Sequence, residues 1–264
     1  MPKLMGIVNV TPDSFSDGGL FLDPERAIAH GRELAAAGAD ILDVGGESTR
    51  PGAEPVSAEE ELRRVEPVIA ALVDGTRSGP IVSIDTAKAA VAVAALDAGA
   101  EIVNDVTALR VDPDLAGLCA ERGCTVVLMH MLGTPRTMQD DPRYDDVVED
   151  VKAFLAARIE AAVAAGIVEE RIWIDPGIGF GKTPSHNLEL LRRLGELREL
   201  GRPLVIGASR KSFLGRLTGR EVADRIGATL AANVASLARG ADVLRVHDVA
   251  EARDAVTTAR AILG

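Results

Sequence analysis

The chain repeats one pattern eight times: a short run rich in β-branched residues, then a longer stretch rich in alanine. The short runs are continuously apolar, which is typical of parallel strands covered on both faces. The longer stretches have the length of helices, and Gly or Gly-Ala closes many of them, as at helix C-caps. We expect strands at residues 4–10, 40–45, 80–85, 101–105, 124–130, 171–177, 203–209 and 242–248. We expect helices at residues 23–38, 58–74, 87–98, 112–122, 146–165, 186–200, 221–239 and 248–263.

Eight strand–helix units predict an α/β fold, a single-domain (β/α)8 TIM barrel over residues 1–264. A doubly wound open sheet is the alternative, but it usually has fewer units and a glycine-rich first turn. The length of 264 residues suits one α/β barrel, and no Pro/Ser-rich linker divides the chain.

Composition limits the classes of partner. Hydrophobic residues make up 47% of the chain and aromatic residues only 3%, so Ala, Val, Leu and Ile must form the core. The net charge of −11 argues against a nucleic-acid partner. Cys119 and Cys124 match no zinc or redox spacing, so we expect reduced thiols. The first ten residues lack a signal-peptide layout and no run approaches membrane-spanning length, so we expect a cytoplasmic protein without a membrane partner.

Polar residues close the predicted strands, and in a barrel these strand ends converge on one mouth. A single such residue is more often an N-cap or a satisfied core group. Their joint occurrence predicts one polar site at the mouth. The residues are Asn9, Asp43, Glu47, Asp85, Asn104, Asp105, His130, Asp175, Ser209, Arg210, Lys211, Arg245 and His247.

These side chains divide into two chemical sets. A neutral-to-acidic set suits a flat heterocycle with several N–H donors, because a buried carboxylate accepts two strong hydrogen bonds from an amidine-like edge. It comprises Asp85, Asn104, Asp175 and Lys211. A donor set suits phosphate oxygens, with arginine favoured for bidentate contact. It comprises Asn9, Thr49, Arg50, Arg245 and His247.

Two local features suggest other chemistry. The segment "PGIGFGKT", residues 176–183, is close to a phosphate-binding P-loop, but Pro176 stands where that motif needs its first glycine. Lys182 and Lys211 follow the sixth and seventh predicted strands, and a barrel lysine can form a Schiff base, as in aldolases. The simpler interpretation is that Lys182 is a solvated loop lysine.

Seven segments occur in an order that is highly specific: "MGIVNVTPDSFSDGG", "DVGGESTRPGA", "VSIDT", "IVNDV", "DPGIGFGKT", "GASRKSFLG" and "RVHDV". With them the chain closely resembles the bacterial dihydropteroate synthases, from about residue 5 to its last residue. The resemblance implies a (β/α)8 barrel and a homodimer. It also implies condensation of 6-hydroxymethyl-7,8-dihydropterin pyrophosphate with p-aminobenzoate, which gives 7,8-dihydropteroate and pyrophosphate for folate synthesis. Sulfonamides compete with p-aminobenzoate in this family.

The resemblance also assigns roles. Asp175, Asn104 and Asp85 would bind the pterin, and Lys211 would contact its acceptors. Arg245 would lie against the pterin face and reach the pyrophosphate. Asn9, Thr49 and His247 would hold the pyrophosphate, and Asn9 would help to bind its Mg²⁺. Phe180, Pro51, Lys211 and Ser212 would frame the p-aminobenzoate ring, and loops carrying Asp17 and Arg50 would close over the site.

The implied reaction replaces pyrophosphate at a methylene carbon. Because dihydropterin can delocalise positive charge at that carbon, we expect a dissociative, SN1-like path that requires water to be excluded. The polar segment after Asn9 is expected to be a lid that orders around pyrophosphate and Mg²⁺. The alternative is a static cap on the first helix.

Two other functions stay open at this point. One is a different pterin-binding barrel, such as a methyltetrahydrofolate methyltransferase, which does not need the "ESTRPG" and "SRKS" loops. The other is a paralogue that binds pterin without catalysis, although no site motif is missing. The segment 131–145 receives no role from its sequence.

Overall fold

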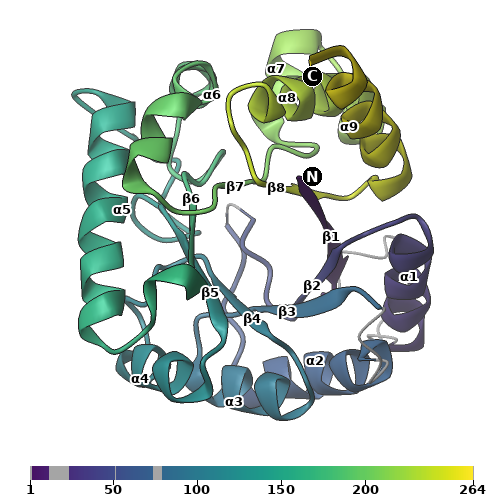
Figure 1. Cartoon of the computed structure of the whole chain (residues 1–264), viewed down its shortest axis with the longest axis vertical. Helices are drawn as coiled ribbons and strands as arrows, with labels where there is room; N and C mark the ends of the chain where they lie inside the picture. The colour runs from purple at the N-terminus through teal and green to yellow at the C-terminus, as the bar shows by residue number, and fades with distance from the viewer. Residues whose placement is uncertain (1, 12–23, 51, 74–78, 264) are drawn as a thin grey trace.

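The computed structural model describes residues 2–11, 24–50, 52–73 and 79–263, in which eight parallel strands form a ring (Figure 1). They are paired in the order β6-β5-β4-β3-β2-β1-β8-β7. A bridge between Ile174 and Leu204 joins the two ends of this order and closes the barrel. The predicted barrel is therefore confirmed, and the doubly wound open sheet is excluded. The strands are β1 (Lys3–Asn9), β2 (Ile41–Gly45), β3 (Ile81–Asp85), β4 (Ile102–Asp105), β5 (Thr125–Met129), β6 (Ile172–Asp175), β7 (Val205–Ile206) and β8 (Val243–Val246).

Helices surround the ring on its outside, as Figure 1 shows. They are α1 (Pro24–Ala36), α2 (Ala58–Leu72), α3 (Ala89–Asp97), α4 (Pro113–Arg122), α5 (Val147–Ala164), α6 (Pro184–Arg192), α7 (Ser212–Thr218), α8 (Ile226–Leu237) and α9 (Val249–Leu263). Short 3₁₀ turns are η2 (Glu169–Arg171), η3 (Leu194–Leu200) and η4 (Val222–Asp224). Within the described residues, no helix is both long enough and apolar enough to span a bilayer.

Three predicted elements differ from the structure. The predicted helix at 186–200 is α6 followed by η3, because Leu194 and Leu197 are both buried at the three-residue spacing that a 3₁₀ turn presents to one side. Residues 210–220, to which no element was assigned from the sequence, contain α7, which buries Phe213 and Leu214. The seventh strand is limited to two residues of the predicted 203–209.

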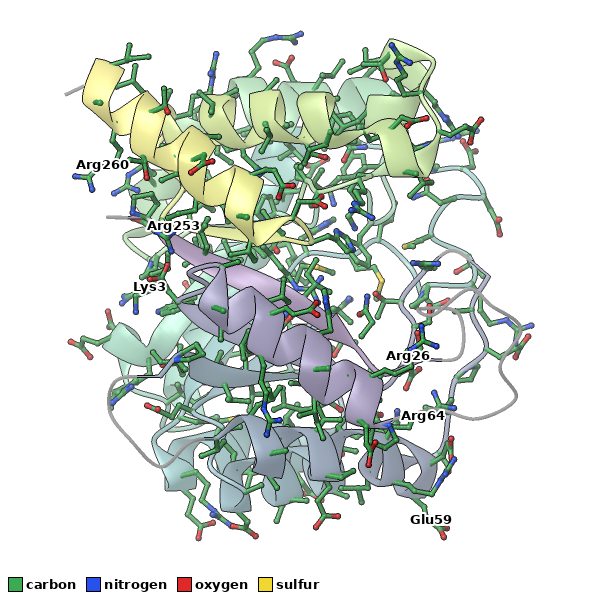
Figure 2. All side chains as sticks on the ribbon, turned by 90° about the vertical axis from the view of Figure 1, so that its right-hand side faces the viewer. Lys3, Arg26, Glu59, Arg64, Arg253 and Arg260 are labelled. Carbon is green, nitrogen blue, oxygen red and sulfur yellow. The ribbon has the colours of Figure 1, made fainter. Side chains whose placement is uncertain are left out.

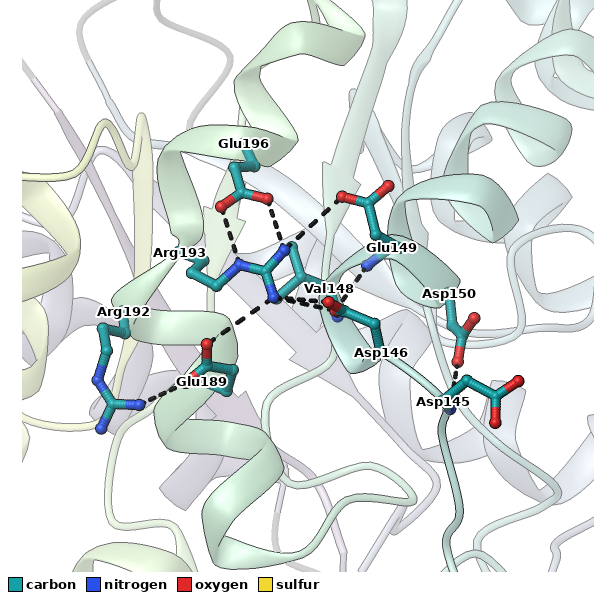
Figure 3. A network of polar contacts seen from close by, with 9 residues as sticks. All are labelled: Asp145, Asp146, Val148, Glu149, Asp150, Glu189, Arg192, Arg193 and Glu196. Atoms are coloured by element: carbon teal, nitrogen blue, oxygen red, sulfur yellow. Dashed lines mark hydrogen bonds and ion pairs between the residues drawn. The ribbon is translucent and has the colours of Figure 1, made fainter.

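The junction of α6 and η3 is fixed by Arg193, which faces carboxylates of three elements (Figure 3). Its Nη1 lies 2.8 Å from Oδ2 of Asp146, the N-cap of α5, and its Nη2 lies 2.8 Å from Glu196 Oε2. A groove of about 520 Å³ lies beside this cluster, between α5 and α6. Because the guanidinium is already paired with carboxylates, we regard this groove as structural.

The aliphatic composition is explained by a core in two parts. One part lies between the strands and the helices and is built mainly of Ala, Val, Leu and Ile. The other fills the barrel interior near the N-terminal ends of the strands, and consists of Met5, Ile41, Ile102, Val127, Val205 and Val243. Cys119 and Cys124 are free and buried, as expected.

The barrel interior changes from apolar to polar over two residues. Because side chains alternate between the faces of a strand, the residue two positions beyond each apolar one also points inward. Two positions beyond Ile41, Ile102 and Val243 stand Asp43, Asn104 and Arg245. Asp175 stands two beyond Trp173, which packs against the same apolar group. The apolar layer therefore forms the floor of a polar site.

Candidate active site

Strand register places four residues at one level of the mouth. Asn9 pairs with Gly45, Gly45 with Asp85, and Asp85 with Asn104. One of the two neighbours of Asp85 in this row is Gly45, and a Cβ on Gly45 would lie 3.4 Å from Asp85 Cβ. Gly45 therefore leaves open space in the row beside the Asp85 carboxylate.

Arg245 is the centre of the charged network. Its Nε donates to Asp43 Oδ2 at 2.6 Å, and its Nη2 donates to Asp85 Oδ2 at 2.8 Å. Burial acts to lower the pKa of Arg245, but the carboxylates of Asp43 and Asp85 outweigh it and raise the pKa. Arg245 is therefore a permanent cation that lies beneath the mouth.

The sequence placed Asp43 among the strand-end residues of the mouth but assigned it no role. It is wholly buried and accepts hydrogen bonds from Ser83 Oγ at 2.6 Å and Asn104 Nδ2 at 3.0 Å, in addition to Arg245. Its two oxygens therefore orient both Asn104 and Arg245. The signal available in the sequence was its period-two spacing from Ile41.

Two carboxyl groups at the mouth have raised pKa values. Burial raises the pKa of Asp85 to about 7, with the cation of Arg245 opposing the rise and Asp43 adding to it. Burial likewise raises the pKa of Asp175 to about 6, although the hydrogen bond from Gly177 N to Asp175 Oδ1 at 2.7 Å favours the ionised form. Both groups gain from a ligand that donates hydrogen bonds or carries positive charge.

Lys211 and Phe180 form a second wall of the site. Lys211 Nζ lies 4.0 Å from the centroid of the Phe180 ring, which is a cation–π arrangement. Burial lowers the pKa of Lys211 to about 8, and the cation of Arg245 contributes to the fall. Gly179 allows this approach, since its Cβ would lie 3.1 Å from Lys211 Cδ.

The segment 131–145, to which the sequence gave no role, supports that wall. Met131 and Met138 belong to a buried cluster with Val106, Met129 and Phe180. Gln139 Nε2 donates to the carbonyl of Gly179 at 2.8 Å, and Tyr144 Oη donates to the carbonyl of Gly181 at 2.7 Å. The segment therefore packs Phe180 and holds the loop on which it lies.

His247 is placed as a neutral donor. Ser209 Oγ lies 2.9 Å from His247 Nδ1 and accepts the backbone N–H of His247 at 3.2 Å. In the tautomer in which the hydroxyl donates to Nδ1, the ring proton is on Nε2. Burial, together with Arg245, lowers the pKa of His247 to about 3. Its Nε2–H is therefore available as an uncharged donor.

Lys182 corrects one expectation. The prediction of a solvated loop lysine is wrong, because Lys182 is buried with 3% of its surface exposed. Its Nζ lies 2.8 Å from His130 Nδ1 and donates to the carbonyl of Phe180 at 2.9 Å. Burial lowers its pKa to about 7. The amine is committed to these two partners and fixes the loop to the residue directly after β5.

Not all strand-end residues join the network. Asp105 instead shapes the turn after β4 by accepting the N–H groups of Thr107 at 2.7 Å and Leu109 at 2.6 Å. Thr49 and Arg50 lie on the partly exposed segment after β2, and no described hydrogen bond joins their side chains to Arg245. Asp17 and Pro51 lie outside the described residues, as does most of the predicted lid. Ser212 is exposed at the first position of α7.

The donor set for a metal is sparse. Within the described ranges, no group of three or more His, Cys, Asp or Glu side chains converges on one point. Asn9, at the end of β1, offers a single carboxamide oxygen. Such a set fits Mg²⁺ only if the ion keeps its waters and is carried by substrate phosphates, which is the usual preference of this ion.

Comparisons with known proteins agree with this geometry. The sequence profile of the pterin binding enzyme family matches residues 5–247. A dihydropteroate synthase of Neisseria meningitidis serogroup B is 49% identical over 97% of this chain and 90% of its own length. A probable bifunctional folylpolyglutamate synthase/dihydropteroate synthase of Haloferax volcanii is 50% identical over 98% of this chain, which spans 30% of that protein.

Solved structures extend the similarity to three dimensions. A Xanthomonas albilineans dihydropteroate synthase with 4-aminobenzoic acid has a TM-score of 0.92 and 53% identity, covering 99% of this chain and 93% of the other. A structure of the enzyme from that organism in complex with 7,8-dihydropteroate has a TM-score of 0.88 and 49% identity, with the same coverage of both chains.

Proposed function

This chain belongs to the pterin-binding enzyme family, among the dihydropteroate synthases, and we propose that it condenses 6-hydroxymethyl-7,8-dihydropterin pyrophosphate with p-aminobenzoate. The products are 7,8-dihydropteroate and pyrophosphate. The observation that carries the proposal is the pair of carboxyl groups with raised pKa values, Asp85 and Asp175, at one barrel mouth, with the Arg245 guanidinium bonded to Asp85. The relatives solved with 4-aminobenzoic acid and with 7,8-dihydropteroate support it.

The pterin is assigned to the deepest part of the mouth. Its 2-amino group and ring N–H form a donor edge that one carboxylate can accept in a bidentate manner. Asp175 is the assigned partner because it is buried at the end of β6 and its Oδ1 is already oriented by Gly177. Asn104, held by Asp43, and Asp85 complete the contacts, while Lys211 donates to the acceptors of the ring.

We assign the stabilisation of the leaving pyrophosphate to hydrogen-bond donors in or directly after β1, β2 and β8. The bond between the methylene carbon and the pyrophosphate oxygen breaks, and its electron pair leaves with the oxygen. Arg245 and the His247 Nε2–H stabilise that charge, together with Asn9 and Thr49. Asn9 would help to hold a Mg²⁺ ion carried by the pyrophosphate, and such an ion would further neutralise the charge of the leaving group. The cation left on the pterin is stabilised by the carboxylates of Asp85 and Asp175.

The second substrate is assigned to the wall formed by Phe180 and Lys211, with Pro51 and Ser212. The lone pair of the aromatic amine forms the C–N bond, and the amine then releases one proton to solvent. Since an aniline-type nitrogen is unprotonated at neutral pH, no strong general base is needed. The loops that carry Asp17 and Arg50 would close over this side and keep water from the cation. We also propose that the protein is a cytoplasmic homodimer.

Substrate omission tests the proposal. The purified protein is mixed with dihydropterin pyrophosphate, p-aminobenzoate and Mg²⁺, and both dihydropteroate and pyrophosphate are measured. We expect dihydropteroate only when both substrates are present. Pterin binding without product would instead indicate a non-catalytic paralogue or a methyltransferase-like enzyme.

A further inference from the structure

A single lysine joins the segment after β2 to the helix behind it. Lys88, in the turn after β3, donates from Nζ to Glu47 on that segment and to Glu61 in α2. The three residues come from two consecutive strand–helix units, Glu47 and Glu61 from β2–α2 and Lys88 from β3–α3. The segment that runs from Gly46 to Arg50 is called the β2 segment below, and it carries Thr49 and Arg50.

The buried member of this cluster depends on the lysine. Glu61 has 0% of its surface exposed, and its Oε1 has no hydrogen-bond partner in the described part of the chain. A buried carboxylate without a counter-charge is costly, so Lys88 is required to compensate it. Burial acts to lower the pKa of Lys88, but Glu47 and Glu61 outweigh it and raise the pKa. The lysine therefore stays cationic and bonded to both.

The first residues of the β2 segment lie directly on α2. A Cβ on Gly46 would lie 2.7 Å from Val65 Cγ1 and 3.0 Å from Glu61 Cγ, so only glycine fits there. Arg64 Nη1 donates to the carbonyl of Gly46 at 2.8 Å. Helix α2 therefore fixes the backbone at Gly46, and Lys88 fixes the side chain at the next residue.

The far end of the β2 segment is less constrained. Arg50 is exposed, and its N–H lies 3.4 Å from Ser48 Oγ. Beyond it, Gly52 N donates to the carbonyl of Pro135 at 3.3 Å, which is a long hydrogen bond. The attachment of Glu47 therefore determines the direction in which the chain that carries Thr49 and Arg50 continues beyond the barrel.

We propose that Lys88 is a positioning residue, which holds Glu47 so that the β2 segment presents Thr49 and Arg50 to the pyrophosphate and the aromatic amine. This inference rests on the proposed function. An ion pair kept only for stability gives little, because an apolar side chain of similar volume at Glu61 serves as well or better. The charged cluster of Lys88, Glu47 and Glu61 is explained if the reaction depends on the position of the β2 segment.

Glu47→Gln is the decisive variant, because it removes the charged attachment and leaves the pairing of Lys88 with Glu61 intact. Loss of one charge-assisted hydrogen bond predicts that KM for p-aminobenzoate rises about tenfold. We expect the Kd of 6-hydroxymethylpterin, measured by calorimetry without pyrophosphate, to stay within about twofold of the wild-type value. Thermal unfolding should change little, because Glu47 is partly exposed and Lys88 keeps its bond to Glu61, so a rise in KM would not come from a loss of folded protein.

The matched control is Glu59→Gln, which removes the same charge from the first turn of α2. Glu59 is exposed and points away from the barrel, whereas Arg64 on the same helix lies toward the loops (Figure 2). This variant should keep the wild-type KM. Lys88→Arg should retain most activity, since a guanidinium can also bridge two carboxylates. Lys88→Met is less informative, because it leaves Glu61 buried without a counter-charge and lowers stability.

The outcomes separate the two claims. If wild-type protein forms no dihydropteroate, the proposed function fails, and the positioning role that rests on it fails with it. If the wild type is active but Glu47→Gln has unchanged KM values for both substrates, the positioning role of Lys88 is overturned. A loss of pterin affinity in Glu47→Gln equal to the rise in KM would also overturn it.

Discussion

Asp43 and Arg245 are 202 positions apart in the chain, yet Arg245 Nε donates to Asp43 Oδ2 at 2.6 Å inside the barrel. Asp43 has 0% of its surface exposed, whereas the Arg245 side chain is 20% exposed at the mouth. The buried carboxylate thus sets the direction of a cation that faces the substrate. The pairing of β8 with β1, the first strand of the chain, makes this contact possible.

Asp43→Asn tests that relationship. The amide keeps an oxygen for Ser83 or Asn104 but loses the charge that orients Arg245. We expect kcat/KM to fall by about 10- to 100-fold, with the larger part in kcat, because the interaction serves the leaving group in the transition state. Steady-state kinetics measure this. Asp97→Asn is the control, since Asp97 is exposed and pairs with Arg122 at the surface. A normal kcat in Asp43→Asn would contradict the role given to Arg245.

The pH profile of kcat/KM for the pterin should be bell-shaped. Asp175, with a pKa of about 6, and Asp85, with a pKa of about 7, must be ionised to bind the pterin and stabilise its cation, so activity rises as pH increases through these values. Lys211, with a pKa of about 8, must be protonated, so activity falls above it. Lys211→Arg should move the alkaline limb to higher pH, because guanidinium stays charged. An alkaline limb that is unchanged in Lys211→Arg would contradict the assignment.

The raised pKa of Asp175 also predicts that this carboxyl group, when ionised, lowers the stability of the folded protein. The folded-state pKa of Asp175 lies above its ordinary value of 3.8, so ionisation opposes folding. Its contribution is therefore most favourable below pH 3.8 and is lost as pH rises through about 6. Asp175→Asn should raise the free energy of unfolding at pH 7 by up to about 3 kcal/mol, and little at pH 4. Urea unfolding at both pH values measures this, and a loss of stability at pH 7 would contradict it.

Gly177→Ala tests the close packing behind Asp175. Gly177 has φ of 68°, and a Cβ there would lie 1.9 Å from the carbonyl oxygen of His130, so the backbone must move. We expect a loss of more than about 3 kcal/mol, with a loss of pterin binding. Gly123→Ala is the matched control, because Gly123 has a similar φ of 62° with no atom near its Cβ. That variant should lose only about 1 kcal/mol. Equal losses in the two variants would exclude the steric explanation.

Phe180→Leu separates the two substrate sites. The ring lies against Lys211 and the methionines of the neighbouring segment, on the side assigned to p-aminobenzoate. We expect KM for p-aminobenzoate to rise about tenfold and the Ki of a sulfonamide to rise with it, because both need the aromatic face. Pterin affinity should be unchanged. If the pterin affinity changed and KM for p-aminobenzoate did not, Phe180 would contact the pterin, and its assignment to p-aminobenzoate would be wrong.

The barrel and much of its mouth were predictable because both follow from periodicity. The alternation of short and long segments predicted eight strand–helix units, and strand ends predicted Asp85, Asn104, Asp175 and Arg245 as neighbours. Whether Lys182 is solvated or buried could not be predicted in this way. Its burial depends on His130 of another strand and on the path of a glycine-rich loop.

The short elements were missed for a related reason. Helix α7 has seven residues, too few for a helical period to stand out in the sequence. The available signals were the apolar pair Phe213 and Leu214 and the glycine at position 219, which ends the helix with φ of 69°. The role of Asp43 was missed because its partners Ser83, Asn104 and Arg245 come from three other strands. Such pairings depend on register, which no single segment specifies.

The most direct measurement is the affinity of Asp175→Ala for the pterin, by calorimetry with 6-hydroxymethylpterin, alongside the wild type and Asp97→Ala. The account predicts that the wild type and Asp97→Ala bind with the same Kd, and that Asp175→Ala, still folded, shows no measurable binding. If Asp175→Ala binds the pterin with nearly the wild-type Kd, the pterin does not lie at this mouth in the way described, and the central claim is wrong.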